Sequence, residues 1–89
     1  MSRDELTTAS ELLRETAEES DAEAAERLRG FADRLDRMAA ADRDPDHGKL
    51  ASVLLKLDEI AGGLDDEQAE TVQTARDHIT SFRETVPGV

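Results

Sequence analysis

A run of apolar residues at helical spacing, between Asp44 and Leu64, constrains the fold of this chain more than any other feature. Asp44 is suited to cap a helix, Pro45 suits the first helical position because its missing N–H needs no partner there, and Gly62-Gly63 favours termination. The apolar residues then recur at steps of three and four: Leu50, Val53, Leu54, Leu57, Ile60, Ala61 and Leu64. The pattern predicts a buried helix over residues 45–62.

The first segment begins with a capping-box pattern, Ser2-Arg3-Asp4-Glu5, in which a serine hydroxyl and a glutamate carboxylate satisfy each other's backbone donors. We expect a helix over residues 3–19. Its apolar stripe consists of Leu6, Ala9, Leu13 and Ala17, with Leu12 alongside.

A second capping-box pattern, Ser20-Asp21-Ala22-Glu23, predicts a new helix over residues 21–41. Its stripe consists of Ala24, Leu28, Phe31, Leu35 and Met38. No Gly or Pro enforces the break, so a single bent helix over residues 3–41 is an alternative. The polar cluster from Glu18 to Asp21 favours the break, because it would otherwise lie within the apolar seam. Gly30 lies opposite the stripe, which suits either a close helix crossing or a tolerated surface glycine.

The last segment opens with Asp65 and Gln68 at capping-box spacing, and we expect a helix over residues 66–86 that Pro87-Gly88 terminates. Its stripe consists of Ala69, Val72, Ala75, Ile79, Phe82 and Val86. Four amphipathic segments with short connections predict an all-α fold, an antiparallel up-and-down four-helix bundle formed by residues 1–89 as a single helical domain. If the first two helices are continuous, the alternative is a long helix plus a helical hairpin.

The net charge of −11 and the sequence pI near 4.4 exclude some classes of function. Binding to nucleic acid needs clustered Lys and Arg, so we expect no nucleic-acid partner. Nine arginines, only two lysines and many carboxylates suit a protein that works in molar salt, where screening removes self-repulsion. A surface that binds a basic partner, or that mimics nucleic acid, is the competing explanation. No run approaches the roughly 20 apolar residues of a membrane span, and the N-terminus lacks the apolar core of a secretion signal, so we expect a cytoplasmic protein.

The sequence offers few candidates for chemistry. Asp residues alternate from Asp42 to Asp46, but a helix–loop–helix calcium site counted from Asp42 needs Gly and Glu where His47 and Val53 stand. His47 is expected to be exposed and His78 to lie at the edge of a stripe with one ring face packed. Neither lies in a metal-ligand motif.

Ser10, Ser52 and Ser81 lack a nucleophile-elbow context. Phe31, Leu35 and Met38 could line a groove for a partner, although core packing is the favoured reading. We therefore expect no catalytic, metal or cofactor site, and no enzyme.

Two segments, Asp44-Pro45-Asp46-His47-Gly48-Lys49-Leu50 and Phe82-Arg83-Glu84-Thr85-Val86-Pro87-Gly88-Val89, carry a family resemblance. The chain resembles, over its whole length, a family of short acidic helical proteins of halophilic archaea that has no assigned activity. The resemblance implies a salt-adapted cytoplasmic protein and transfers no catalytic residue. Phe82 stands where tyrosine is more usual in that family, so a role for a phenol hydroxyl is absent here.

Together these features predict a non-enzymatic protein-interaction or assembly module, with a homodimer or a protein partner and no membrane association. A homodimer is favoured because an 89-residue aliphatic core is marginal alone. The alternative is an acidic regulator that occupies a basic nucleic-acid-binding surface on a partner protein.

Overall fold

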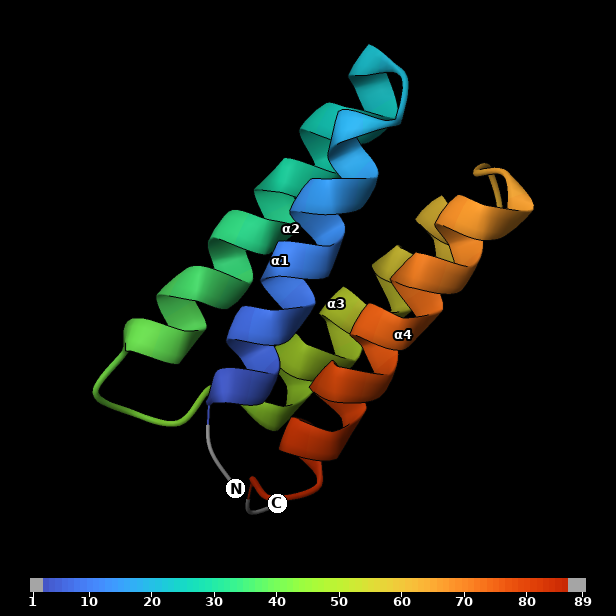
Figure 1. The fold of residues 1–89 in the computed structure, drawn as a ribbon. Coiled ribbons are helices and arrows are strands. Elements are labelled where there is room, and N and C mark those ends of the chain that lie inside the picture. The colour runs from blue at the N-terminus through green and yellow to red at the C-terminus, as the bar shows by residue number, and fades with distance from the viewer. Residues whose placement is uncertain (1–2, 87–89) are drawn as a thin grey trace.

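The computed structural model describes residues 3–86, and these residues form four α-helices and no strand. The helices, coloured along the chain in Figure 1, are α1 (Asp4–Glu18), α2 (Ala22–Ala40), α3 (His47–Ala61) and α4 (Asp66–Arg83). They pack against one another in a bundle 35 Å long, 20 Å wide and 17 Å deep. The predicted all-α bundle is confirmed.

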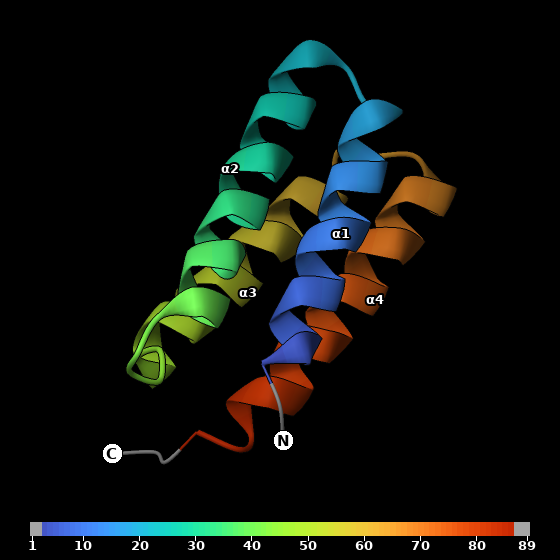
Figure 2. The same cartoon turned by 60° about the vertical axis from the view of Figure 1, so that its left-hand side comes forward.

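Helix α1 packs between α2 and α4, and α3 packs against α4 (Figures 1 and 2). Successive helices run in opposite directions along the bundle. The two outer members of this row, α2 and α3, have few close backbone contacts with each other. The helix backbones are therefore close together on three sides of the bundle and more widely spaced between α2 and α3, which we call the open side.

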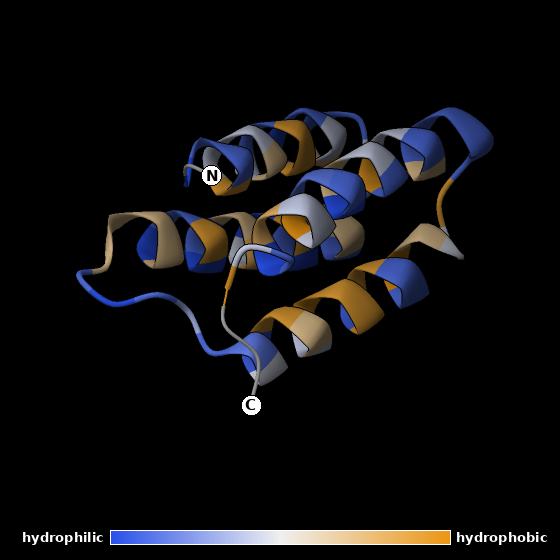
Figure 3. Ribbon diagram, turned by 90° about the horizontal axis from the view of Figure 1, so that it is seen from below, coloured by the Kyte–Doolittle hydropathy of each residue, from blue (hydrophilic) through white to orange (hydrophobic). Residues whose placement is uncertain are grey.

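The core is aliphatic apart from Phe82, and the stripes predicted for the first and third helices are buried within it, except that Leu12 and Leu64 are only partly buried. Helix α3 is the most hydrophobic of the four helices, as its orange residues in Figure 3 show. The fully buried large side chains come from all four helices: Leu6, Leu13, Leu28, Leu35, Leu50, Leu57, Ile79, Val53 and Val72.

The buried stripe of α2 is turned from the predicted one. Ala25 and Ala32 are buried with the two leucines of the helix, whereas Phe31 and Met38 are only half-buried. Small alanine side chains let α2 approach α1 closely, so the α1 side of α2 becomes its core face. Phe31 and Met38 are consequently left at the edge that faces α3.

The break between α1 and α2 is present, so the continuous-helix alternative is wrong. The capping box expected at Ser20 is also wrong, because the N-cap is Asp21, whose carboxylate accepts a 2.9 Å hydrogen bond from the Ala24 N–H. The Ser20 hydroxyl instead donates to the Thr16 carbonyl at 2.7 Å and so satisfies the end of α1.

Helix α3 begins two residues later than predicted. Its N-cap is Asp46, so Pro45 precedes the helix, and Asp44 is not the cap. The Asp44 carboxylate is 3.0 Å from the guanidinium of Arg3, which also donates to the Ala41 carbonyl. Arg3 thus ties the loop of residues 41–46 to the start of α1. The predicted end is confirmed, since Gly62 is the C-cap.

Helix α4 has Asp65 as its N-cap, and the carboxylate accepts a 2.8 Å hydrogen bond from the Gln68 N–H. The Gln68 side chain does not complete a capping box, because it donates to the Glu19 carbonyl at 2.6 Å and so links α4 to the end of α1. The helix ends at Arg83 rather than at 86. Ser2 and the Pro87-Gly88 pair, predicted to cap and terminate helices, lie outside the described residues.

Candidate functional site

The two histidines lie apart from any catalytic arrangement. His78 is half-buried on α4, as expected for a residue at the edge of a stripe, and its Nδ1 is 2.8 Å from a Glu5 carboxylate oxygen on α1. His47, which was expected to be exposed, is half-buried at the start of α3, and its backbone carbonyl accepts a 3.3 Å hydrogen bond from Arg83 Nε on α4. Both histidines therefore join helices to one another.

The aspartate-rich loop between α2 and α3 holds no cluster of ligands. Within residues 3–86, no three His, Asp or Glu side chains are grouped so that they could hold a metal ion. This includes the small hollow between α1 and α4 that Glu15, Glu19 and Glu67 line. The Asp44 carboxylate is engaged by Arg3.

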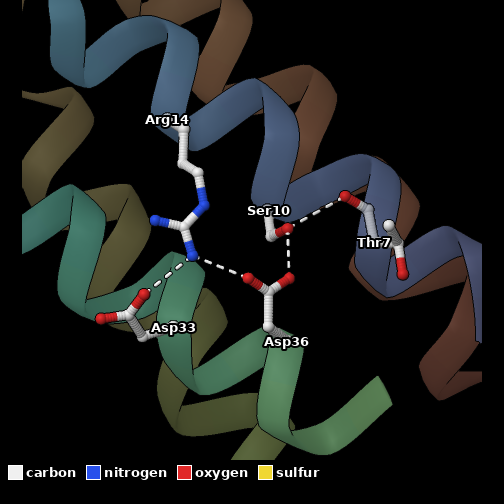
Figure 4. A network of polar contacts seen from close by, with 5 residues as sticks. All are labelled: Thr7, Ser10, Arg14, Asp33 and Asp36. Atoms are coloured by element: carbon white, nitrogen blue, oxygen red, sulfur yellow. Dashed lines mark hydrogen bonds and ion pairs between the residues drawn. The ribbon is translucent and has the colours of Figure 1, made fainter. Parts of the chain in front are cut away.

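A polar network joins α1 to α2 (Figure 4). The Ser10 hydroxyl is 2.6 Å from Asp36 Oδ1 and 3.0 Å from the Thr7 carbonyl oxygen. The Arg14 guanidinium is 2.7 Å from carboxylate oxygens of both Asp33 and Asp36. The hydrogen bond from Ser10, with that from Arg14, lowers the pKa of Asp36, and hydrogen bonds to the two carboxylates raise the pKa of Arg14.

This network has the geometry of a structural link and not of a nucleophilic centre. Ser10 is 2% exposed, so a substrate could not reach its hydroxyl. Asp36 is a poor base for the serine proton, because its pKa is lowered. The other serines named above have no histidine as a base, because within residues 3–86 the histidine hydrogen bonds are to Glu5 and Arg83 and none is to Ser52 or Ser81.

A groove runs between α2 and α3, along the open side of the bundle. One part has a volume of about 660 Å³ and the other about 340 Å³, and Arg34 lines both. We call the two parts together the α2–α3 groove. From α2 it is lined by residues at helical spacing, namely Arg27, Gly30, Phe31, Arg34, Arg37 and Met38.

Cations gather in this groove although the chain is strongly acidic. Six of the eleven Lys and Arg residues line it, against three carboxylates. These cations are Arg27, Arg34, Arg37, Arg43, Lys49 and Lys56. Elsewhere in the described structure, Arg3, Arg14 and Arg76 each form an ion pair with an aspartate. None of the six groove cations has an ion pair within residues 3–86, although the Arg34 guanidinium lies 5.2 Å from the Phe31 ring centre.

From the sequence, Phe31, Leu35 and Met38 could line a partner groove or pack in the core, with core packing favoured. The structure divides them: Leu35 is fully buried, whereas Phe31 and Met38 pack against the core and also line the groove. The gathering of cations was missed. The sequence did contain a pattern that indicates it. The two lysines on α3 are seven residues apart, and so are Arg27 and Arg34 on α2, so each pair lies on one helix face.

No helix in the described part of the chain has the length and apolar character needed to cross a membrane. No curated protein and no solved structure shows a significant match to the chain. A family model described as "Family of unknown function (DUF7553)" matches residues 1–85, which is nearly the whole chain. The chain therefore belongs to this family of unknown function.

Proposed function

We propose that this chain is a non-enzymatic protein-interaction or assembly module of a salt-adapted cytoplasm. The observation that carries the proposal is the open side between α2 and α3. Phe31 and Met38 are half-buried there, and unpaired cations surround them. A bundle that leaves apolar and charged side chains together along an open groove is suited to bind a further helix or a second protein.

Salt adaptation is supported by the charge of −11 and by the resemblance to acidic proteins of halophilic archaea. Exposed carboxylates cover every helix, for example Glu11 on α1, Glu26 on α2, Glu59 on α3 and Glu70 on α4. In molar salt these charges repel one another only at short range. The acidic surface then keeps the protein hydrated without opposing assembly.

The test is association in 2 M potassium chloride, measured by sedimentation velocity and by capture of proteins from a lysate of matched salt. We expect the wild-type chain either to form a homodimer or to retain a protein, and Met38→Glu to abolish that association. Thr74→Glu, which adds the same charge at an exposed position on α4, is the matched control and should retain it. A monomer that retains no protein in a Met38-dependent way would contradict the proposal.

A second candidate is an acidic regulator that occupies a basic nucleic-acid-binding surface on a partner. It is supported by a row of three exposed carboxylates on α1. Neighbouring carboxylates in the row are about one helical turn, 5.4 Å, apart: Glu11, Glu15 and Glu18. Charge reversal separates the two candidates. If the double variant Glu11→Lys, Glu15→Lys fails to capture the protein while Met38→Glu still captures it, the regulator is favoured.

A further inference from the structure

We propose that the α2–α3 groove binds an amphipathic helix of another protein, and that this helix carries Asp and Glu side chains along its flanks. The inference rests on the proposed interaction function and names the chemistry of the partner. It follows from the charge, the shape and the apolar lining of the groove.

The charge of the groove favours an acidic partner. The groove lining carries six cations against three carboxylates, and one of these carboxylates, Asp44, is already paired with Arg3. More than half of the cations of a chain with net charge −11 therefore face one groove without a carboxylate partner of their own. Negatively charged side chains of a partner protein would form ion pairs with these cations.

The length of the groove favours an elongated partner. On α2 the cations extend from Arg27 to Arg37, about 15 Å at a rise of 1.5 Å per residue, and on α3 they extend from Lys49 to Lys56, about 10 Å. Two rows of this length flank a space of two to three helical turns. A compact anion would contact only one end of the rows, whereas an elongated ligand reaches both.

The apolar lining distinguishes a helix from a simple polyanion. Phe31 lies between Arg27 and Arg34 on α2, and Met38 directly follows Arg37, so both can contact apolar residues of a bound helix. Leu55, the exposed large hydrophobic residue of the described structure at 63% exposure, lies on α3 three residues after Ser52 and four residues before Glu59, and both of these line the groove. Rows of charge around apolar side chains are the lining that an amphipathic helix requires.

Two other occupants fit less well. A second copy that met this groove about a twofold axis would bring cations against cations, because such an interface uses the same surface on both subunits. Nucleic acid would be repelled by the net charge of −11. Both are outcomes of the experiment.

The experiment measures binding of two labelled 21-residue peptides by fluorescence anisotropy in 0.5 M potassium chloride, after circular dichroism has shown that the chain is folded there. Both peptides carry leucine at steps of three and four. One has glutamate at the flanking positions, and the other has lysine at the same positions. Net charge alone predicts that the lysine peptide binds more tightly, whereas the groove predicts that the glutamate peptide binds at least tenfold more tightly.

Two variants of α2 locate the binding site. Arg34→Glu, in the middle of the groove, should weaken binding of the glutamate peptide at least tenfold. Arg29→Glu makes the same change at an exposed position of the same helix that does not line the groove, and should weaken binding by less than about twofold. Circular dichroism of both variants checks that they fold equally well.

Three results would overturn the inference: tighter binding of the lysine peptide, equal losses in the two variants, or Arg34-dependent binding of a 20-residue oligothymidylate as tight as that of the glutamate peptide. A dimer that Arg34→Glu dissociates would also overturn it, in favour of a second copy. None of these results excludes that the chain associates with a protein. That interaction function is tested separately by the sedimentation and capture experiment.

Discussion

Asp36 joins α1 to α2 through contacts with Ser10 and Arg14 that the apolar pattern of the sequence does not reveal. The partners are 26 and 22 residues away along the chain, so only the packing of the two helices brings them together. The same holds for Glu5 and His78, which are 73 residues apart. Sequence periodicity identified the buried residues of α1 and α3, but it could not identify which polar side chains meet across a helix interface.

Asp36 should make stability depend on pH in the acid range. Because its pKa is lowered in the folded chain, Asp36 contributes stability above its ordinary pKa of 3.8, and this contribution is lost as the pH falls through the folded value. We expect Asp36→Asn to destabilise by about 1 kcal/mol at pH 7, the usual net value of one hydrogen bond. The difference from wild type should shrink at pH 3.

Urea unfolding at the two pH values measures this difference. Asp42→Asn is the control, since Asp42 is an exposed aspartate in the loop of residues 41–46. A difference between wild type and Asp36→Asn that is the same at pH 7 and pH 3 would show that the carboxylate of Asp36 is not the group responsible.

Leu57 and His47 test where the core lies. Leu57 is fully buried, so Leu57→Ala should destabilise by about 2–5 kcal/mol. His47 is half-buried, and the hydrogen bond that it accepts from Arg83 uses its backbone carbonyl. His47→Ala should therefore lower the free energy of unfolding by less than about 1 kcal/mol. Chemical denaturation of the two variants side by side measures both. Equal losses would mean that the core is not where the structure has it.

At the scale of the elements, the number and order of the helices could be predicted from the sequence, and the starts of helices less well. The stripes of α1 and α3 are buried as predicted, because strong periodicity and Gly62-Gly63 leave few alternatives. The caps at Ser20 and Asp44 were misassigned, because several Ser and Asp residues compete there. Tertiary contacts decided between them: Arg3 engages Asp44, and Asp46 is left to cap α3.

Helix α2 illustrates a second limit of the sequence pattern. Ala25 and Ala32 lie on the buried face while Phe31 faces the groove, because the backbone of α2 lies close to α1 and has few close contacts with α3. Hydrophobicity alone favours the larger side chain as the core residue. Only the arrangement of the helices shows that the small side chains are the ones that make the close contact.

Gly30, in the middle of α2, offers a test at this scale. A Cβ atom at this position would meet nothing within 4 Å, so the close helix crossing considered for this glycine is absent. Gly30→Ala should therefore stabilise the protein by up to about 1 kcal/mol, since alanine loses less backbone entropy in a helix. A thermal melt measures the shift. Destabilisation would mean that another group approaches α2 closely at Gly30.

At the scale of the whole molecule, charge is distributed unevenly. Carboxylates occur on every helix, while six cations gather along one groove. The total charge could be read from the sequence, but this separation could not, because it depends on α2 and α3 forming the open side of the bundle. The acidic faces therefore repel one another at low salt, and the groove carries the opposite charge that the proposed acidic partner would need.

Salt dependence of unfolding is the most direct test of a salt-adapted module. At 0.1 M salt the screening length is about 10 Å, so carboxylates on neighbouring helices repel one another, whereas at 1 M it is about 3 Å. We predict that a circular dichroism melt in 2 M potassium chloride has a markedly higher midpoint than one in 0.1 M. Two midpoints that agree within error would contradict salt adaptation and would favour a basic partner as the reason for the acidic surface.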